Sequence, residues 1–329
     1  MVYTMEQFKK EEADSEIPKI VKQIEDSVSS VVVGQKASVR DIVRAILCDG
    51  HVLVEGVPGI AKTLLIKTMA SVMGCEMKRI QFTVDLLPTD ITGITAYEPN
   101  TGFHVVKGPI FANFIIADEI NRSPPKTQSA MLEAMQEKCV TIGKETFSLP
   151  TPFFVMATEN PIEVSGVYTL PEAQIDRFLF KILMTYPEAL DEVKILTQNT
   201  TISKFEDYPL NKVLSPEKII SLQEKVKKVY SSSEIKEYII RIISETRSKN
   251  FEFSKFISYG ASPRASISLY IASKAEALMN GRNFVIPDDV KTVAYPVLRH
   301  RIILNYEAEA EKITTDQVIK HVLEKVEVT

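Results

Sequence analysis

The residues best suited to chemistry lie in one stretch, Gly56-Val57-Pro58-Gly59-Ile60-Ala61-Lys62-Thr63-Leu64. This stretch follows the apolar run 51–55 and leads into a helix-like segment, 64–73. Between a strand and a helix, backbone N–H groups and the helix N-terminus cradle phosphate oxygens, and glycine lets the backbone approach them. In such loops the lysine reaches the β- and γ-phosphates, and the threonine hydroxyl helps to ligate Mg²⁺. The stretch therefore predicts a loop that binds nucleotide phosphates, with Thr63 as a metal ligand.

Ala61 departs from the common pattern, in which glycine stands just before the lysine. We expect the methyl group to be tolerated if the residue is already helical. The alternative interpretation is an ordinary glycine and proline turn that happens to end in Lys-Thr. A second set of residues favours the phosphate loop.

That second set is Phe114-Ile115-Ile116-Ala117-Asp118-Glu119, an apolar run short enough for a buried parallel strand that ends in two carboxylates. We expect Asp118 to hold Mg²⁺ directly or through water, and Glu119 to polarise the water that attacks the γ-phosphorus. Taken alone, the pair could be a solvated strand end. Its position downstream of a phosphate loop favours catalysis.

A mainly parallel sheet covered by helices must position these residues. Short apolar strands are expected at 52–55, 77–81, 114–117 and 153–157, and helices alternate with them. Ligands of such sheets bind at the carboxyl ends of the strands, where both halves of the proposed site lie. The predicted fold class is therefore α/β, with an N-terminal helical segment at 1–29 and a nucleotide-binding core at 30–186.

Residues 187–329 show helical spacing and predict an all-helical lid. Two insertions in the core, 92–108 and 139–149, are predicted to be hairpins. In the first, strand-like residues flank the turn signal Glu98-Pro99-Asn100-Thr101-Gly102. Each hairpin is either surface decoration or a functional projection.

Taken together, these motifs resemble the MoxR-type AAA+ ATPases. The resemblance covers most of the chain, from about residue 33 to 302, and the matching stretches are the variant loop ending Ala61-Lys62-Thr63, Val33-Gly34-Gln35, Asp118-Glu119-Ile120-Asn121-Arg122-Ser123-Pro124-Pro125-Lys126-Thr127-Gln128, Ala157-Thr158-Glu159-Asn160-Pro161, Ala173-Gln174-Ile175-Asp176-Arg177-Phe178, Ser262-Pro263-Arg264 and Leu298-Arg299-His300-Arg301-Ile302.

The resemblance implies ATP and Mg²⁺ as cofactors and gives roles to further residues. It puts Val33-Gly34-Gln35 beside the adenine, and Asn160 next to the γ-phosphate as the water-orienting sensor. Arg177 matches the arginine finger that reaches the nucleotide of a neighbouring subunit. Its alternative role is a surface ion pair with Asp176 or Asp118. Arg264 matches the lid arginine that couples lid position to nucleotide state.

The family is known for ring assembly, so the resemblance implies a homo-oligomer, a hexameric ring. It also implies a chaperone-like role in remodelling or maturing a client protein, together with a von Willebrand A-domain partner, and hairpins that project toward a channel or client. Arg122 could act in trans or organise the subunit interface.

Composition is consistent with a cytoplasmic protein. The 329 residues are 45% hydrophobic, enough for a sizeable core, and carry a net charge of −4. That charge gives no general reason to bind nucleic acid, and the hairpin tips hold few basic residues. No apolar run approaches membrane-spanning length. The histidines and cysteines show no zinc-ligand spacing. A nucleic-acid motor and, less favoured, a P-loop metabolite kinase remain as alternatives.

Overall fold

The computed structural model describes residues 16–99, 102–161, 167–198, 205, 208 and 210–328. Its centre is a parallel sheet with the strand order β2-β5-β8-β1-β9. The bounds of these strands are β1 Val52–Gly56, β2 Met77–Gln81, β5 Phe114–Asp118, β8 Phe154–Glu159 and β9 Phe180–Met184. This confirms the α/β fold, and the predicted strands lie within two residues of the observed ones. The strand β9 was not predicted.

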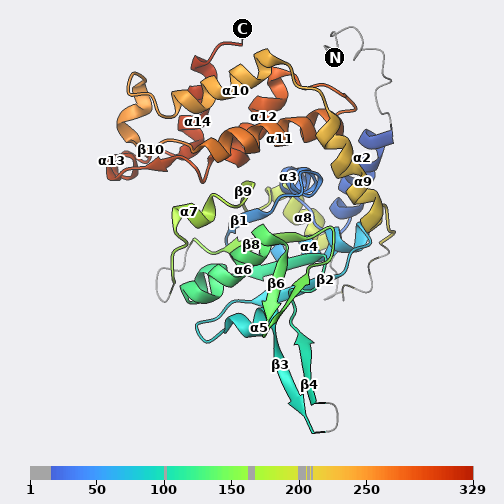
Figure 1. Ribbon diagram of the computed structural model, residues 1–329. Coiled ribbons are helices and arrows are strands. Elements are labelled where there is room, and N and C mark those ends of the chain that lie inside the picture. Colours follow the sequence, from blue (N-terminus) through green and yellow to red (C-terminus); the bar gives the residue numbers. More distant parts are fainter. Residues whose placement is uncertain are drawn as a thin grey trace.

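Helices cover both faces of the sheet (Figure 1). The helices of the core and of the segment before it are α2 Glu16–Ser29, α3 Lys36–Leu47, α4 Lys62–Val72, α5 Pro88–Thr92, α6 Pro125–Glu137 and α7 Glu172–Ile175, with a 3-10 turn at Ile120–Arg122. Apolar residues at helical spacing explain α2, since Ile17, Val21, Ile24 and Val28 are all buried.

The described part of the predicted lid is built mainly from helices, as predicted; those nearest the C-terminus lie above the core in Figure 1, whereas the first lies at the level of the sheet. These are α8 Ala189–Gln198, α9 Pro216–Lys228, α10 Ser233–Glu245, α11 Pro263–Met279, α12 Pro287–Leu298, α13 Tyr306–Ala310 and α14 Thr315–Lys325, with a 3-10 turn at Glu252–Phe256. The lid is not entirely helical, however, because β10 Ile257–Tyr259 pairs with β11 Ile303–Leu304. This short ribbon pairs backbone groups in the two connections that precede α11 and α13.

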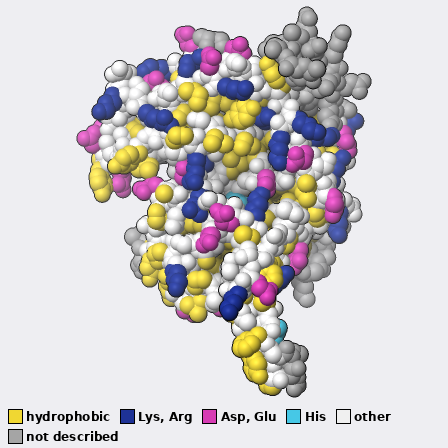
Figure 2. Space-filling view, in the orientation of Figure 1, with side chains coloured by type: hydrophobic (Ala, Val, Ile, Leu, Met, Phe, Trp, Pro, Cys, Tyr) yellow, Lys and Arg dark blue, Asp and Glu magenta, His cyan; other side chains and the backbone are white. Residues whose placement is uncertain are grey.

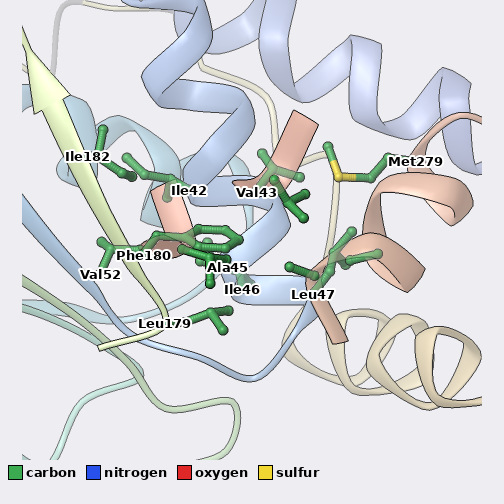
Figure 3. Packing of buried hydrophobic residues seen from close by; sticks show 14 of the residues in the cluster. Ile42, Val43, Ala45, Ile46, Leu47, Val52, Leu179, Phe180, Ile182 and Met279 are labelled. Atoms are coloured by element: carbon green, nitrogen blue, oxygen red, sulfur yellow. The ribbon is translucent and has the colours of Figure 1, made fainter. Parts of the chain in front are cut away.

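One apolar core joins the sheet to the lid. Helix α3 packs Ile42 and Ile46 beside Phe180 and Ile182 of β9, while Met279 of α11 approaches from the other side (Figure 3). The division at residues 29 and 186 remains a prediction, because this core continues across both boundaries.

Two hairpins leave the core at the predicted insertions. β3 Gly93–Glu98 pairs with β4 Gly102–Lys107, and β6 Cys139–Ile142 pairs with β7 Glu145–Ser148. The first projects from the body on the side away from the lid (Figure 1). No helix in the described ranges is long and apolar enough to cross a membrane.

Candidate nucleotide site

Two residues of the loop between β1 and α4, Gly59 and Ala61, have positive φ angles. Gly59 has φ +84°, and a Cβ built on it would meet nothing within 4 Å, so the space above it is open. Lys62 begins α4, and its Nζ donates to the carbonyl oxygen of Gly56 at 2.7 Å, which keeps the ammonium group at the loop. Gly56 allows close packing, because a Cβ there would lie 2.5 Å from Cδ1 of Ile60 and 2.9 Å from the carbonyl oxygen of Met184.

Ala61 is not helical, so the condition under which its methyl group was expected to be tolerated is not met. It has φ 63° and ψ 26°, the left-handed conformation, directly before the first residue of α4. A non-glycine residue pays a conformational cost of about 1–2 kcal/mol in this region. The loop therefore keeps the backbone that glycine would adopt there, and the alanine carries strain at the site.

An apolar pocket of about 390 Å³ adjoins the loop. Val33 and Gln35 line it from the segment before α3, Gly59 and Leu64 line it from the loop side, and Tyr186 lines it beyond β9. Gln35 is held in place because its Nε2 donates to the carbonyl oxygen of Thr185 at 3.0 Å. A flat aromatic ring such as a purine, whose faces pack on apolar side chains, fits a cavity of this size and lining.

Gly34 shapes the neighbouring wall and is not among the residues that line this pocket. It has φ +80°, and a Cβ there would lie 2.8 Å from Cβ of Pro187. Any larger residue would push apart the segment before α3 and the start of the lid. Glycine is therefore required at this position by its backbone conformation and by close packing.

Asp118 and Glu119 lie at the carboxyl end of β5, beside β8. The Asp118 carboxylate is nearly buried and accepts from Thr158 Oγ1 at 2.6 Å through Oδ1. Its other oxygen, Oδ2, accepts from Arg79 Nη2 at 2.5 Å and Nε at 3.1 Å. A carboxylate and the hydroxyl of Thr63 are oxygen ligands of the kind that Mg²⁺ takes, so the donor set fits the metal.

The Glu119 side chain is held by neighbours in its own chain. Gln81 Nε2 donates to Glu119 Oε2 at 3.0 Å, and Arg122 Nε lies 3.2 Å from the same oxygen. The backbone of Glu119 is left-handed, with φ 56°, and its N–H donates to Thr158 Oγ1 at 2.8 Å. Such strain, supported by neighbouring hydrogen bonds, is typical of functional positions.

Asn160 is buried just beyond the end of β8. Because β8 lies between β1 and β5, Asn160 occupies the strand end between the phosphate loop and the two carboxylates. The loop, Asp118, Glu119 and Asn160 therefore gather at one edge of the sheet.

Arg177 follows Asp176 in the chain, and Arg264 of the lid lies near the Asp176 carboxylate. Arg177 is exposed and its Nη1 donates to the carbonyl oxygen of Leu132 at 3.2 Å. Arg264 Nη1 lies 3.8 Å from Asp176 Oδ2. Within the described ranges neither side chain bonds to the phosphate loop, Asp118 or Glu119, and Arg177 forms no ion pair. The alternative role of Arg177, an ion pair with Asp176 or Asp118, is therefore not seen.

Sequence reasoning missed Arg79, Gln81 and Thr158 as site residues. Arg79 and Gln81 lie on β2, whose pairing with β5 sets Gln81 opposite Asp118. Polar residues at the end of a predicted strand were a usable signal, but the register that gives them partners is not visible in sequence.

The first hairpin presents aromatic side chains near its tip. Tyr97 and Phe103 pair across the strands with ring centroids 5.1 Å apart and are 63% and 78% exposed. Figure 2 shows hydrophobic atoms along this projection. The second hairpin packs against the first, since a Cβ on Gly143 would lie 2.8 Å from Thr95 Oγ1.

Comparison with known proteins gives concordant matches. Residues 51–180 match the model of the ATPase family associated with various cellular activities (AAA), and residues 253–322 match the AAA lid domain. The chain is 44% identical over 304 residues to the chaperone MoxR1 of Mycobacterium tuberculosis, covering 91% of this chain and 80% of that protein. It is 43% identical over 304 residues to the uncharacterized protein YeaC of Bacillus subtilis, covering 92% and 93%.

A solved structure has the same fold. The protein comes from Cytophaga hutchinsonii and was provisionally described as an ATPase. It superimposes with a TM-score of 0.88 at 45% identity and covers 99% of this chain and 100% of its own.

Proposed function

This chain belongs to the MoxR family of AAA+ ATPases, and we propose that it hydrolyses ATP with Mg²⁺ as a ring in which each site is completed by the next subunit. The observation that carries the proposal is the separation of the site residues into two groups. One group surrounds the phosphate loop, and the other, Arg177 and Arg264, makes no contact with it among the described residues. An exposed arginine outside its own site is available to a neighbour.

Each residue then has a distinct task. Lys62 holds the β- and γ-phosphates, while Asn160 and Glu119 orient and polarise the attacking water. Bound Mg²⁺, ligated by Thr63 and Asp118, would neutralise phosphate charge. Arg177 from the next subunit would stabilise the charge of the transition state, a contribution worth about 10³–10⁵ in rate.

Hexameric rings and client remodelling complete the proposal. Head-to-tail contacts close into rings when the rotation permits. The exposed aromatic pair Tyr97 and Phe103 suits an apolar polypeptide segment and gives no charge for a phosphate backbone. A von Willebrand A-domain partner belongs to the same proposal through the family resemblance alone. A DNA-stimulated ATPase activity would instead favour the nucleic-acid motor.

The direct test is phosphate release by the purified protein with Mg²⁺ and with excess chelator. Glu119→Gln should still bind ATP but lose nearly all turnover, because a positioned general base contributes about 10²–10⁴ in rate. Lys62→Ala should instead lose nucleotide binding. Glu172→Gln, an exposed acid on α7, is the matched control and should behave as wild type. Turnover by Glu119→Gln above about a tenth of wild type would contradict the role of Glu119.

A further inference from the structure

The segment that carries Arg177 is held by a buried arginine of the lid, Arg301. The Arg301 side chain lies just beyond α12 and is 2% exposed. Its Nε donates to Asp176 Oδ1 at 2.7 Å. Its Nη2 donates to the backbone carbonyl oxygens of Asp176 at 3.1 Å and Phe178 at 2.7 Å. These two carbonyls flank Arg177, so the lid fixes the backbone on both sides of it.

The remaining donors of Arg301 tie this segment to the lid helix. Nη1 donates to the carbonyl oxygen of Leu179 at 3.1 Å and to that of Val297, in the last turn of α12, at 2.6 Å. All five N–H donors of the guanidinium are thereby used. A lysine would keep the charge opposite Asp176 but has only three donors, without the planar fork.

Two further lid residues hold the same segment. His300 is buried, and burial together with the positive charge of Arg301 lowers its pKa well below the ordinary value, so the imidazole is neutral. Its Nε2 lies 3.0 Å from the carbonyl oxygen of Phe178, and it donates a hydrogen bond to that oxygen in the tautomer with the proton on Nε2. Ser262, which caps α11, donates its hydroxyl to Asp176 Oδ2 at 3.0 Å.

Arg177 differs from Arg301, because its backbone is fixed while its side chain is exposed. Its backbone N–H donates to Gln174 and its neighbours are fixed by the lid, but its side chain is exposed and bonds to the carbonyl oxygen of Leu132. A rigid base with an exposed guanidinium suits a side chain that must reach a fixed point outside its own subunit.

We propose that Arg301 is a positioning residue for Arg177, through which the lid of one subunit aims the arginine that completes the site of the next. The inference rests on the proposed function, since it takes Arg177 as the finger. It adds a direction of coupling: a lid movement in one subunit changes hydrolysis in its neighbour. A merely structural Arg301 would instead stabilise its own subunit and leave the neighbour's site unaffected.

Mixed rings separate these roles. Arg301→Lys should bind nucleotide with wild-type affinity and lose about 10²-fold in kcat, the cost of a misplaced catalytic group. Mixed with Lys62→Ala, which has a sound finger, it should regain activity at some interfaces. Mixed with Arg177→Ala, it should regain none, because both defects lie on the finger side. Arg299→Lys is the matched control. Arg299 pairs with Asp316 at 2.7 Å, and no hydrogen bond joins it to the described residues 176–179 around Arg177. The kcat of this variant should stay near wild type.

The outcomes distinguish this inference from the proposed function. The reference is the mixture of Arg177→Ala with Lys62→Ala, which should be active. Given an active reference, the inference would be overturned if Arg301→Lys regained ATP hydrolysis when mixed with Arg177→Ala but not when mixed with Lys62→Ala. A wild-type kcat for Arg301→Lys would do the same. An inactive reference mixture would instead overturn the shared site itself. Should Arg301→Lys fail to fold, His300→Phe removes the hydrogen bond from the lid to the carbonyl oxygen of Phe178 and carries the same expectations in the mixtures.

Discussion

The guanidinium of Arg79 lies against the carboxylate of Asp118, with Nη2 2.5 Å from Oδ2, so a protein cation occupies one oxygen of the carboxylate that we propose as a Mg²⁺ ligand. The two residues come from neighbouring strands, β2 and β5. Arg79 is half exposed and can move away from Asp118. It therefore competes with Mg²⁺ for this carboxylate but does not block it permanently.

Replacing Arg79 should therefore strengthen metal binding. We expect Arg79→Gln to lower the Mg²⁺ concentration for half-maximal ATP hydrolysis by about two- to fivefold, the range for an exposed ion pair. Titration of steady-state turnover with Mg²⁺ at saturating ATP measures this. Lys78→Gln on the same strand, which pairs with Glu76 and not with the site, should leave the midpoint unchanged. A higher midpoint for Arg79→Gln would show that Arg79 assists the metal.

Ala61→Gly should stabilise the protein while retaining nucleotide binding. Relief of the left-handed strain, about 1–2 kcal/mol, is partly offset by about 0.4–1 kcal/mol of added freedom in the unfolded chain. The net gain expected in the free energy of unfolding is about 0–1.6 kcal/mol, with a midpoint near 0.8 kcal/mol. Denaturant titration without nucleotide measures it. A loss of stability would mean that the alanine methyl group makes a compensating contact in the pocket.

The aromatic tip of the first hairpin should be required for binding unfolded polypeptide. Tyr97→Ser with Phe103→Ser should leave basal ATP hydrolysis near wild type, because the pair lies outside the phosphate site. Affinity for a permanently unfolded probe, reduced and carboxymethylated α-lactalbumin, should fall at least tenfold, since burial of one such ring is worth about 1.5–3 kcal/mol. Tyr259→Ser, an equally exposed tyrosine of the lid, is the control. Unchanged affinity for the probe would mean that this aromatic pair does not bind unfolded polypeptide.

His51 should make stability depend on pH. It is buried at the start of β1, where Nδ1 accepts from Val155 N–H at 3.2 Å and Nε2 lies 3.1 Å from the carbonyl oxygen of Met135. Burial lowers its pKa from 6.5 to about 4. The unfolded chain therefore takes up a proton first as pH falls, so the contribution of neutral His51 is complete above about pH 6.5 and is lost toward pH 4.

Between pH 7 and pH 5 this loss amounts to about 2 kcal/mol of the free energy of unfolding. Urea titrations at both pH values should show a smaller loss for His51→Gln than for wild type. An equal loss in the two proteins would assign the pH dependence to other groups, such as His300.

Local chemistry explains what the sequence could predict. The predicted phosphate loop and the pair Asp118 and Glu119 are contiguous residues next to strongly apolar strands, so the sequence could single them out and place them at strand ends; their roles stay predictions. The strand β9 was missed because it is short and interrupted by the charged Lys181. The backbone of Ala61 could not be predicted, because a left-handed alanine is set by the surrounding loop rather than by its own preference.

Contacts between distant segments explain what the sequence could not predict. Gln81 reaches Glu119 only through the register of β2 against β5. Arg301 meets Asp176 across more than a hundred residues of chain. Residue type alone could not separate Arg177, whose side chain is exposed, from Arg301, which is buried in the lid.

The shared site is the central claim, and mixing two inactive variants tests it most directly. Arg177→Ala lacks the finger and Lys62→Ala lacks nucleotide, so each should be inactive alone. After subunit exchange with nucleotide present to favour assembly, sound sites should reappear at some interfaces, and turnover plotted against mixing ratio should peak near equal amounts. A flat, inactive mixture despite demonstrated exchange would contradict a site shared through Arg177.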